Sequence, residues 1–191
     1  MSLDSRAVDK CSNCNGTLEL RYEQGHTAVD CDSCGATRIM SAPPILVVAH
    51  DVEENPELLG TFATTQLQQT IRGFCYLCSG PVEGTVVDSS LDSETDDSGN
   101  VKVAYECTEC GAPFYTAATT AVLDHPVVVS LLHDAGIDYR EIPSWRITRI
   151  LDSEERVNDD DPVRVEVTVT VDDELTFVLD ENLDVVEYSR E

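Results

Sequence analysis

Apolar and polar residues alternate most regularly in the last third of the chain. The segments VRVEVTVTV (163–171) and LTFVLD (175–180) place an apolar residue at every second position, and VVEY follows after a short turn. The alternating apolar residues are Val163, Val165, Val167, Val169, Val171, Leu175, Phe177 and Leu179. A period of two predicts strands of an antiparallel sheet with one solvated face. The shorter alternation in SWRITRI (144–150) predicts a further strand, with Trp145 in the core.

Two segments show helical spacing instead. Asn55 and Pro56 provide an N-cap and a first-turn proline, and Gly73 ends the pattern. A second helix is expected from about 124–126 to Gly136. The apolar stripes are Leu59, Phe62, Ala63, Leu67 and Ile71 in the first helix, and Val128, Leu131, Leu132 and Ala135 in the second. Both stripes need a partner surface, within the chain or across a dimer, and the second helix is expected to cover the C-terminal sheet.

Eight cysteines form four CxxC pairs, which fall into two sets. The first set is Cys11, Cys14, Cys31 and Cys34, and the second is Cys75, Cys78, Cys107 and Cys110. Two thiolates separated by two residues can bind one ion from a tight turn, and a second such pair completes a tetrahedron. The spacing predicts two zinc ribbons that hold two structural Zn²⁺ ions. Iron is a minor alternative, since four thiolates also suit it, and disulfides or free thiols are the other readings.

The two cysteine sets look like an internal repeat. CSNCNGTLEL matches CYLCSGPVEG, and AVDCDSCGATRI matches AYECTECGAPFY. In each set, hairpin strands are expected between the CxxC pairs, and a glycine (Gly35 or Gly111) follows the second pair, where it would let the backbone approach the sulfurs. The second hairpin carries an extra acidic loop, 88–100, which lacks the EF-hand spacing and is expected to be solvated rather than a calcium site.

The net charge of the chain limits the classes of partner that it can be expected to bind. The net charge is −25, from 37 acidic against 12 basic residues, and only two of the basic residues are lysines. Concentrated salt screens such a surface, so we expect a halophilic archaeal source, with an acidic mesophile protein as the alternative. The scattered arginines make direct nucleic-acid binding by this chain unfavourable. The sequence shows no membrane span and no signal peptide, which favours a cytoplasmic protein with reduced thiols.

No motif of a common enzyme class is present. The sequence lacks a glycine-rich phosphate loop, GxSxG and HExxH. The four histidines, His26, His50, His125 and His133, are spread along the chain, and structural roles are expected for them. A site with four protein ligands leaves no open position for substrate or water. We therefore expect a protein that is not an enzyme.

Together these patterns predict an α+β fold, with two four-cysteine zinc ribbons each followed by a helix, and a C-terminal antiparallel sheet covered by a helix. The expected segments are a first ribbon at 1–50, a linking helix and second ribbon at 51–121, and a helix with the antiparallel sheet at 122–191.

Several segments resemble the C-terminal region of haloarchaeal ArsR-like winged-helix transcriptional regulators. The residues that carry this resemblance are the paired CxxC motifs, PELLGTFATTQLQQTIRGFC, HPVVVSLLHDAGIDYREIPSW and LTFVLDENLDVVE. In that family a winged-helix domain lies upstream and reads DNA. Here Met1 stands only ten residues before Cys11, so the sequence departs from the family pattern, and either an excised C-terminal portion or a stand-alone relative is expected.

The resemblance implies a role in transcription regulation. Our first hypothesis is a zinc-binding effector or dimerisation module of an archaeal regulator, which meets a second copy, another protein or a ligand and has no helix-turn-helix of its own. A stand-alone zinc-ribbon adaptor for protein partners is the second hypothesis. A thiol-based redox sensor, which releases zinc on oxidation, is the third.

Overall fold

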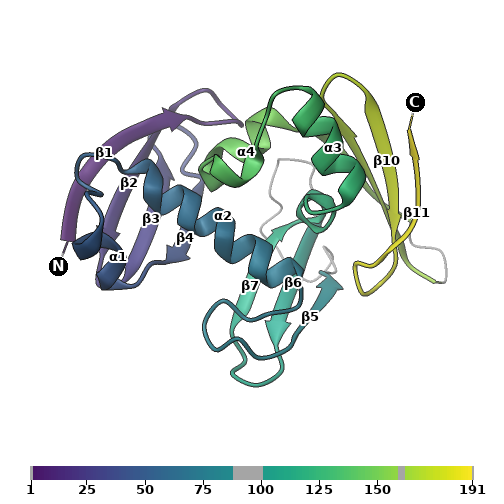
Figure 1. Cartoon of the computed structure of the whole chain (residues 1–191), viewed down its shortest axis with the longest axis horizontal. Coiled ribbons are helices and arrows are strands. Elements are labelled where there is room, and N and C mark those ends of the chain that lie inside the picture. The colour runs from purple at the N-terminus through teal and green to yellow at the C-terminus, as the bar shows by residue number, and fades with distance from the viewer. Residues whose placement is uncertain (1, 88–100, 159–161, 191) are drawn as a thin grey trace. The chain divides into compact units, whose positions relative to one another are not determined.

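The computed structural model describes residues 2–87, 101–158 and 162–190 (Figure 1). The described residues form an α+β fold with three antiparallel sheets and a small number of helices. The acidic loop at 88–100 lies outside the described residues, so its solvation stays a prediction. Among the described residues, no helix combines the length and the apolar character needed to cross a bilayer.

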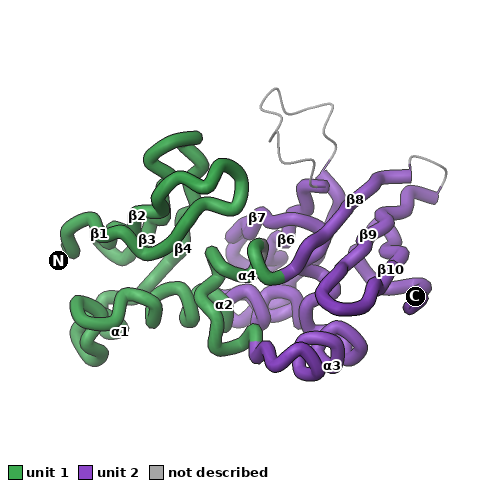
Figure 2. Tube along the Cα trace, turned by 90° about the horizontal axis from the view of Figure 1, so that it is seen from above, with its two compact units in different colours: residues 1–65, 139–150 green, residues 66–138, 151–191 purple. Residues whose placement is uncertain are grey.

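Two compact units make up the chain (Figure 2). The first contains residues 1–65 and 139–150, and the second contains residues 66–138 and 151–191. Helix α2 (Glu57–Ile71) begins in the first unit and ends in the second. The division into three segments that the sequence suggests stays a prediction.

The first unit contains a four-stranded sheet with strands in chain order. Its strands are β1 (Ser2–Lys10), β2 (Thr17–Glu23), β3 (His26–Cys31) and β4 (Thr37–Ser41). Helix α1 (Pro44–Ala49), the 3₁₀ helix η2 (Tyr139–Glu141) and helix α4 (Ser144–Ile150) belong to the same unit. The core includes Leu20, Tyr22 and Val29 from the sheet together with Leu59 and Trp145. The strand β1 and the helix α1 were not expected from the sequence.

The strand expected at SWRITRI is wrong, because this segment is helix α4. Trp145 is nevertheless a core residue, and it packs so closely on α2 that a Cβ at Gly60 would lie 2.5 Å from the indole ring. The other face of α4 carries Arg146 and Arg149, and both donate to the carboxylate of Asp9. Residues three apart share one face of a helix but opposite faces of a strand. The alternation of Trp145 and Ile147 was too short to separate the two possibilities.

The second unit contains the two other sheets. The three-stranded sheet has β5 (Val82–Val86), β6 (Lys102–Cys107) and β7 (Pro113–Ala117) in that order. The four-stranded sheet has the order β11-β10-β9-β8, with β8 (Asp152–Asn158), β9 (Arg164–Thr170), β10 (Glu174–Leu179) and β11 (Val185–Arg190). The alternating residues expected to face inward on β9 and β10 are fully buried, which confirms these strands. Strand β8 was not expected.

The helices of the second unit end where the sequence indicates. Helix α3 (Pro126–Asp134) follows the 3₁₀ helix η1 (Ala118–Val122), and Gly136 just beyond α3 has a φ of 75°. His125 caps α3, because its Nδ1 accepts a hydrogen bond from the N–H of Val127 at 3.4 Å. The His125 ring also contacts the ring of Phe177 on β10, with centroids 5.1 Å apart. These contacts give His125 the structural role that was expected for it.

A buried carboxylate connects the two sheets of the second unit. Glu155 on β8 accepts hydrogen bonds from the N–H groups of Val101 (2.6 Å), Ala118 (3.3 Å) and Thr119 (2.7 Å). The hydroxyl of Thr119 also donates to Glu155. Because a buried carboxylate is stable only when it is hydrogen-bonded, this arrangement fixes the ends of β6 and β7 against β8.

Candidate metal centres

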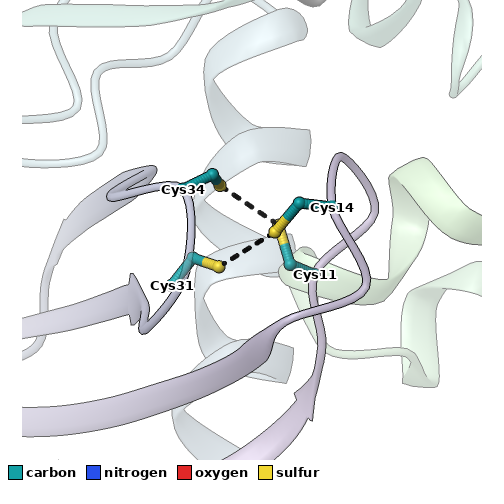
Figure 3. A group of neighbouring side chains, drawn as sticks. All are labelled: Cys11, Cys14, Cys31 and Cys34. Carbon is teal, nitrogen blue, oxygen red and sulfur yellow. Dashed lines mark hydrogen bonds between the residues drawn. The ribbon is translucent and has the colours of Figure 1, made fainter.

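The structure brings the eight cysteines together in two groups of four. They are Cys11, Cys14, Cys31 and Cys34 in the first unit, called site 1, and Cys75, Cys78, Cys107 and Cys110 in the second unit, called site 2. Within each group all sulfurs lie within 4.8 Å of one another. In site 1, two cysteines come from the turn before β2, Cys31 ends β3, and Cys34 lies in the turn between β3 and β4; their sulfurs point toward one another (Figure 3).

The sulfur separations fit a tetrahedral metal site. The distances are 3.8 Å between Cys11 and Cys34 and 3.4 Å between Cys14 and Cys31 in site 1. In site 2 the corresponding distances are 3.7 Å and 3.5 Å. A zinc–sulfur bond of about 2.3 Å gives tetrahedral sulfur–sulfur edges of about 3.8 Å, whereas a disulfide bond is about 2.05 Å long. All eight cysteines are free, so the disulfide reading does not apply to this structure.

The four CxxC turns share one backbone geometry. In each turn the N–H of the first cysteine donates to the carbonyl oxygen five residues later, over distances of 2.8 to 3.1 Å. The carbonyl of that cysteine accepts from the N–H four residues later, at 2.9 to 3.3 Å. The two bonds close a tight turn that presents both sulfurs on one side. The same two backbone hydrogen bonds therefore hold the ligands in place in all four turns.

Each turn also requires a left-handed residue four positions after its first cysteine. Asn15, Gly35, Ser79 and Gly111 occupy this position, with φ values of 61°, 72°, 63° and 67°. The expectation that Gly35 and Gly111 allow a close approach to the sulfurs is wrong, because a Cβ at either would meet nothing within 4 Å. These glycines serve the left-handed backbone instead.

A close approach occurs at a different glycine, five positions after the first cysteine of each set. A Cβ at Gly16 would lie 2.6 Å from Oγ of Ser33, and one at Gly80 would lie 2.9 Å from Cγ of Glu109. Each of these two neighbours belongs to the second CxxC turn of the same site. The glycine therefore lets the two turns meet, which is a further respect in which the two sites repeat each other.

Backbone N–H groups direct hydrogen bonds at several sulfurs. Gly16 donates to Sγ of Cys14 at 3.4 Å, and Ser33 donates to Sγ of Cys31 at 3.5 Å. In site 2, Leu77 donates to Cys75 and Gly80 to Cys78, both at 3.4 Å. Such bonds stabilise a thiolate over a thiol. The turns therefore supply both the positions of the sulfurs and part of the compensation for their negative charge.

One sulfur in each site has a clearly lowered pKa. The backbone N–H groups of Cys34 and Ser33 lower the pKa of Cys31 to about 6. Burial raises the pKa of Cys75. Hydrogen bonds from the backbone N–H groups of Cys78 and Leu77 have a larger effect in the opposite direction, and the pKa is lowered to about 7. Metal binding requires thiolates, and a lowered pKa favours the thiolate form of these two ligands.

Other sulfurs have a raised pKa: Cys14 in site 1, and Cys78 and Cys110 in site 2. A hydrogen bond from the N–H of Gly16 lowers the pKa of Cys14. The hydrogen bond between the Cys14 and Cys31 sulfurs raises it, and the resulting pKa is about 12. The pKa of Cys78 is also raised to about 12, where the N–H of Gly80 lowers the pKa and the neighbouring thiols raise it. Metal binding requires thiolates, so a cation at the centre would displace the protons of these thiols.

Burial alternates in the same way at both sites. The first cysteine of each CxxC pair is buried and the second is exposed. The buried cysteines are Cys11, Cys31, Cys75 and Cys107, and the exposed ones are Cys14, Cys34, Cys78 and Cys110. Each site therefore has an inner edge that belongs to its sheet and an outer edge that solvent reaches.

The side chains between the cysteines differ between the two sites. Site 1 has the polar, exposed residues Ser12 and Asn13 in its first turn. Site 2 has Tyr76 and Leu77 there; Leu77 is 60% exposed, and the Tyr76 ring contacts Phe114 edge-on at 5.9 Å. Among the described residues, the groups that could hold a metal contain cysteine only, so the structure brings no histidine into either site.

The chain belongs to the family described as "Domain of unknown function (DUF7351)", whose match covers residues 8–185. This range includes both sites. No curated protein sequence and no solved structure matches the chain.

Proposed function

We propose that this member of the DUF7351 family is a non-catalytic protein that binds two structural zinc ions, one in site 1 and one in site 2. The observation that carries the proposal is the pair of four-sulfur groups with separations of 3.4 to 3.8 Å. Thiolates are soft ligands that favour zinc or iron over hard cations. A set of four cysteines completes the tetrahedron, so neither ion would have a position for substrate.

In this proposal each ion is the centre of a zinc ribbon. One CxxC turn precedes the first strand of a hairpin and the other joins its second strand to a third, in β2-β3-β4 and again in β5-β6-β7. Each ribbon precedes a helical segment in the chain, α1 with α2 after β4, and η1 with α3 after β7. A metal that joins the two turns contributes its binding free energy to the folding of the strands between them.

Metal content gives the direct test of this part. The chain purified from cells in buffer without added metal is expected to contain two zinc ions, measured by inductively coupled plasma mass spectrometry. Titration of the metal-free chain with zinc should order the amide resonances of both hairpins together with metal uptake. Iron in place of zinc, or fewer than two ions per chain, would contradict the proposal.

We further propose that the protein acts as an effector or dimerisation module in transcription regulation. Support comes from the resemblance of its motifs to the C-terminal region of haloarchaeal ArsR-like regulators and from exposed apolar side chains such as Phe74 and Tyr115. The net charge of −25 disfavours DNA binding by this chain itself. Reading DNA would then depend on another domain or on a partner.

An antibody raised against the chain tests this regulatory role. On a blot of source-cell lysate we expect a band well above 20.9 kDa, the mass of this sequence, because an upstream DNA-binding domain would add to it. Recombinant chain on the same gel provides the size standard. A band at 20.9 kDa would favour the stand-alone adaptor for protein partners instead.

The redox-sensor alternative has its own support, since one sulfur of every CxxC pair is exposed. In that reaction hydrogen peroxide takes two electrons from two thiolates and, with two protons, becomes two molecules of water while the sulfurs form a disulfide. Loss of the ligands releases the zinc. A chromogenic zinc chelator measures this release, and retention of both ions at micromolar peroxide would exclude the sensor.

A further inference from the structure

The outer faces of β2-β3-β4, in the four-stranded sheet of the first unit, and of the three-stranded sheet β5-β6-β7 can be compared residue by residue. In both sheets the cross-strand pair next to the metal site joins an apolar residue to a cysteine: Leu18 with Cys31, and Val82 with Cys107. The next pair points to the opposite, outer face. It consists of two acidic residues in each sheet, Glu19 with Asp30 in the first and Glu83 with Glu106 in the second.

In the first sheet an arginine compensates the acidic pair. Arg21 lies two residues beyond Glu19 on the same face of β2. Its Nε donates to Oδ2 of Asp30 over 2.7 Å. Like charges directly opposite each other on a sheet are destabilising, and this guanidinium offsets them.

In the second sheet the corresponding residue is Thr85, which lies two residues beyond Glu83 and opposite Ala104. Threonine carries no charge, and within the described part of the chain neither Glu83 nor Glu106 forms a salt bridge. Both glutamates are exposed. The second repeat therefore has facing carboxylates like the first, and it lacks an arginine at the position of Arg21, which pairs with Asp30 in the first.

Exposed apolar side chains flank this acidic pair on the same face. Phe74 pairs with Pro81 in an isolated β-bridge, and Pro81 lies two residues before Glu83, on the same face. The Phe74 side chain is 57% exposed. On this face of the edge strand β7, Tyr115 lies opposite Ala104 of β6 and is 60% exposed. Exposed aromatic residues beside unpaired charge are typical of a surface that meets a protein partner.

The Tyr115 ring also has a cation next to it within the chain. The ammonium nitrogen of Lys102 lies 5.2 Å from the centre of the ring, which is a cation–π distance. Lys102 occupies the end of the sheet away from site 2, two residues from Ala104 and four from Glu106. The proposed position for a cation, between Glu83 and Glu106, is therefore separate from the position of the Lys102 ammonium group on this face.

We propose that the outer face of β5-β6-β7 binds a protein segment that carries an arginine flanked by apolar side chains. The guanidinium would lie against Glu83 and Glu106, on the face where Arg21 pairs with Asp30 in the first sheet, and the apolar neighbours would cover Phe74 and Tyr115. A planar guanidinium is suited to two carboxylates because it offers several donors in fixed directions. The proposal rests on the proposed zinc in site 2, since that ion holds the ends of β5 and β6 together.

The charge of the chain selects the kind of partner. At −25 the chain repels a second copy of itself and attracts basic segments. Apolar contacts on either side of the acidic pair add affinity that salt does not screen. A basic protein partner therefore fits this face better than a homodimer does.

The test uses the zinc-loaded, ¹⁵N-labelled full chain and a defined probe. The probe is an acetylated and amidated hexapeptide of alternating leucine and arginine, and the matched probe has citrulline, the neutral isostere of arginine, in its place. We expect the arginine peptide to shift the amide resonances of Glu83, Glu106 and Tyr115. The citrulline peptide should leave these resonances near their free positions.

Two variants make the assignment specific. Thr85→Arg supplies the missing guanidinium within the chain, and it should weaken binding by about fivefold, the effect of an exposed ion pair at the strong end of its range. The matched Arg21→Thr removes the guanidinium from the first sheet, so new peptide-induced shifts should appear at Glu19 and Asp30. Both substitutions are at exposed positions, and amide dispersion checks that each variant folds.

The outcomes separate this proposal from the metal proposal. Two zinc ions per chain without shifts on this face, or equal shifts with both peptides, would overturn the docking surface alone. An unchanged affinity in Thr85→Arg would overturn it as well. Shifts of Glu83 and Glu106 on dilution of the protein by itself would assign the face to a second copy and reject the basic partner. Absence of zinc would instead reject the proposed metal centres.

Discussion

In site 1, Ser12 and Asn13 stand between the cysteines of the first turn, whereas site 2 has Tyr76 and Leu77 in the same two places. The backbone around them is the same in both sites, with the same pair of hydrogen bonds and the same left-handed residue in each turn. The metal-binding geometry therefore depends on the cysteines and on the residues that permit the turn. The residues between and beside them are free to differ, and they give the two sheets different surfaces.

The two sheets are also supported in different ways. The first extends its hairpin with β1, which pairs along β2 through two register shifts. The second has no added strand of this length among the described residues, and Glu155 from another sheet holds the ends of β6 and β7. Four predictions, in order of decreasing effect, test how far the two sites are equivalent and where they part.

Loss of one ligand should unfold one sheet only. We expect Cys31→Ser and Cys107→Ser each to retain one zinc ion per chain and to lose the dispersed amide resonances of the affected hairpin. Structural zinc sites have apparent binding free energies of about 10–16 kcal/mol, so a sheet without its ion would not fold. Zinc content and NMR spectra provide the measurement. A variant that keeps two ions and an unchanged melting curve would contradict the metal assignment, and one that loses both ions would show that the sites depend on each other.

Removal of the Glu155 carboxylate should destabilise the second sheet and not the first. Glu155→Ala leaves the N–H groups of Val101 and Thr119 without their acceptor. Each unsatisfied buried donor costs about 1–3 kcal/mol, so a loss of several kcal/mol is expected. Urea unfolding followed by amide resonances of both sheets measures the effect. Glu154→Ala at the neighbouring exposed position is the control. An equal loss of stability in that variant would contradict the stabilising role of the Glu155 hydrogen bonds.

The left-handed position should respond alike in both sites. Gly35→Ala and Gly111→Ala meet no neighbouring atom, so their effect comes from the backbone alone and should be about 1–2 kcal/mol of lost stability. Ser79→Gly is expected to stabilise by a comparable or smaller amount, because serine at a φ of 63° is strained. Chemical denaturation of the zinc-loaded proteins tests this. A clear difference between the two alanine variants would mean that the turns are not equivalent.

The smallest effect concerns the outer face of the first sheet. Arg21→Thr removes an exposed ion pair with Asp30 and should reduce stability by about 0.2–1 kcal/mol. Because salt screens exposed charges, the difference between the wild type and the variant should shrink in molar KCl. Thermal melts at low and high salt provide the comparison. A difference that grows with salt would show that Arg21 acts through packing rather than through its charge.

Local patterns predicted the elements whose residues are close in sequence. The helix ends at Gly73 and Gly136 and the proline-led start of α3 follow from conformational limits of single residues. The alternation on β9 and β10 was long enough to define a period of two. By contrast, α4 is short, and its helical form is supported by the contacts of Arg146 and Arg149 with Asp9, more than a hundred residues away in sequence.

The strands β1 and β8 were missed for a related reason. Strand β1 is SLDSRAVDK, which is largely exposed and shows no clear alternation, and it becomes a strand through pairing with β2. Strand β8 carries only Glu155 as a buried residue, and a buried glutamate reads as a surface residue in sequence. Polar segments of this kind take their conformation from the partners they pair with.

The amino-acid order was enough to show which cysteines belong together, because two residues between ligands suit one tight turn and the repeat assigns the turns in pairs. It was also enough for the acidic character of the surface and for the strands with a long regular period. Only the folded chain shows that Trp145 lies on a helix, that Glu155 is a buried acceptor, and that Glu83 faces Glu106 without an arginine. These features depend on strand register and on contacts between distant residues, and a linear pattern carries neither.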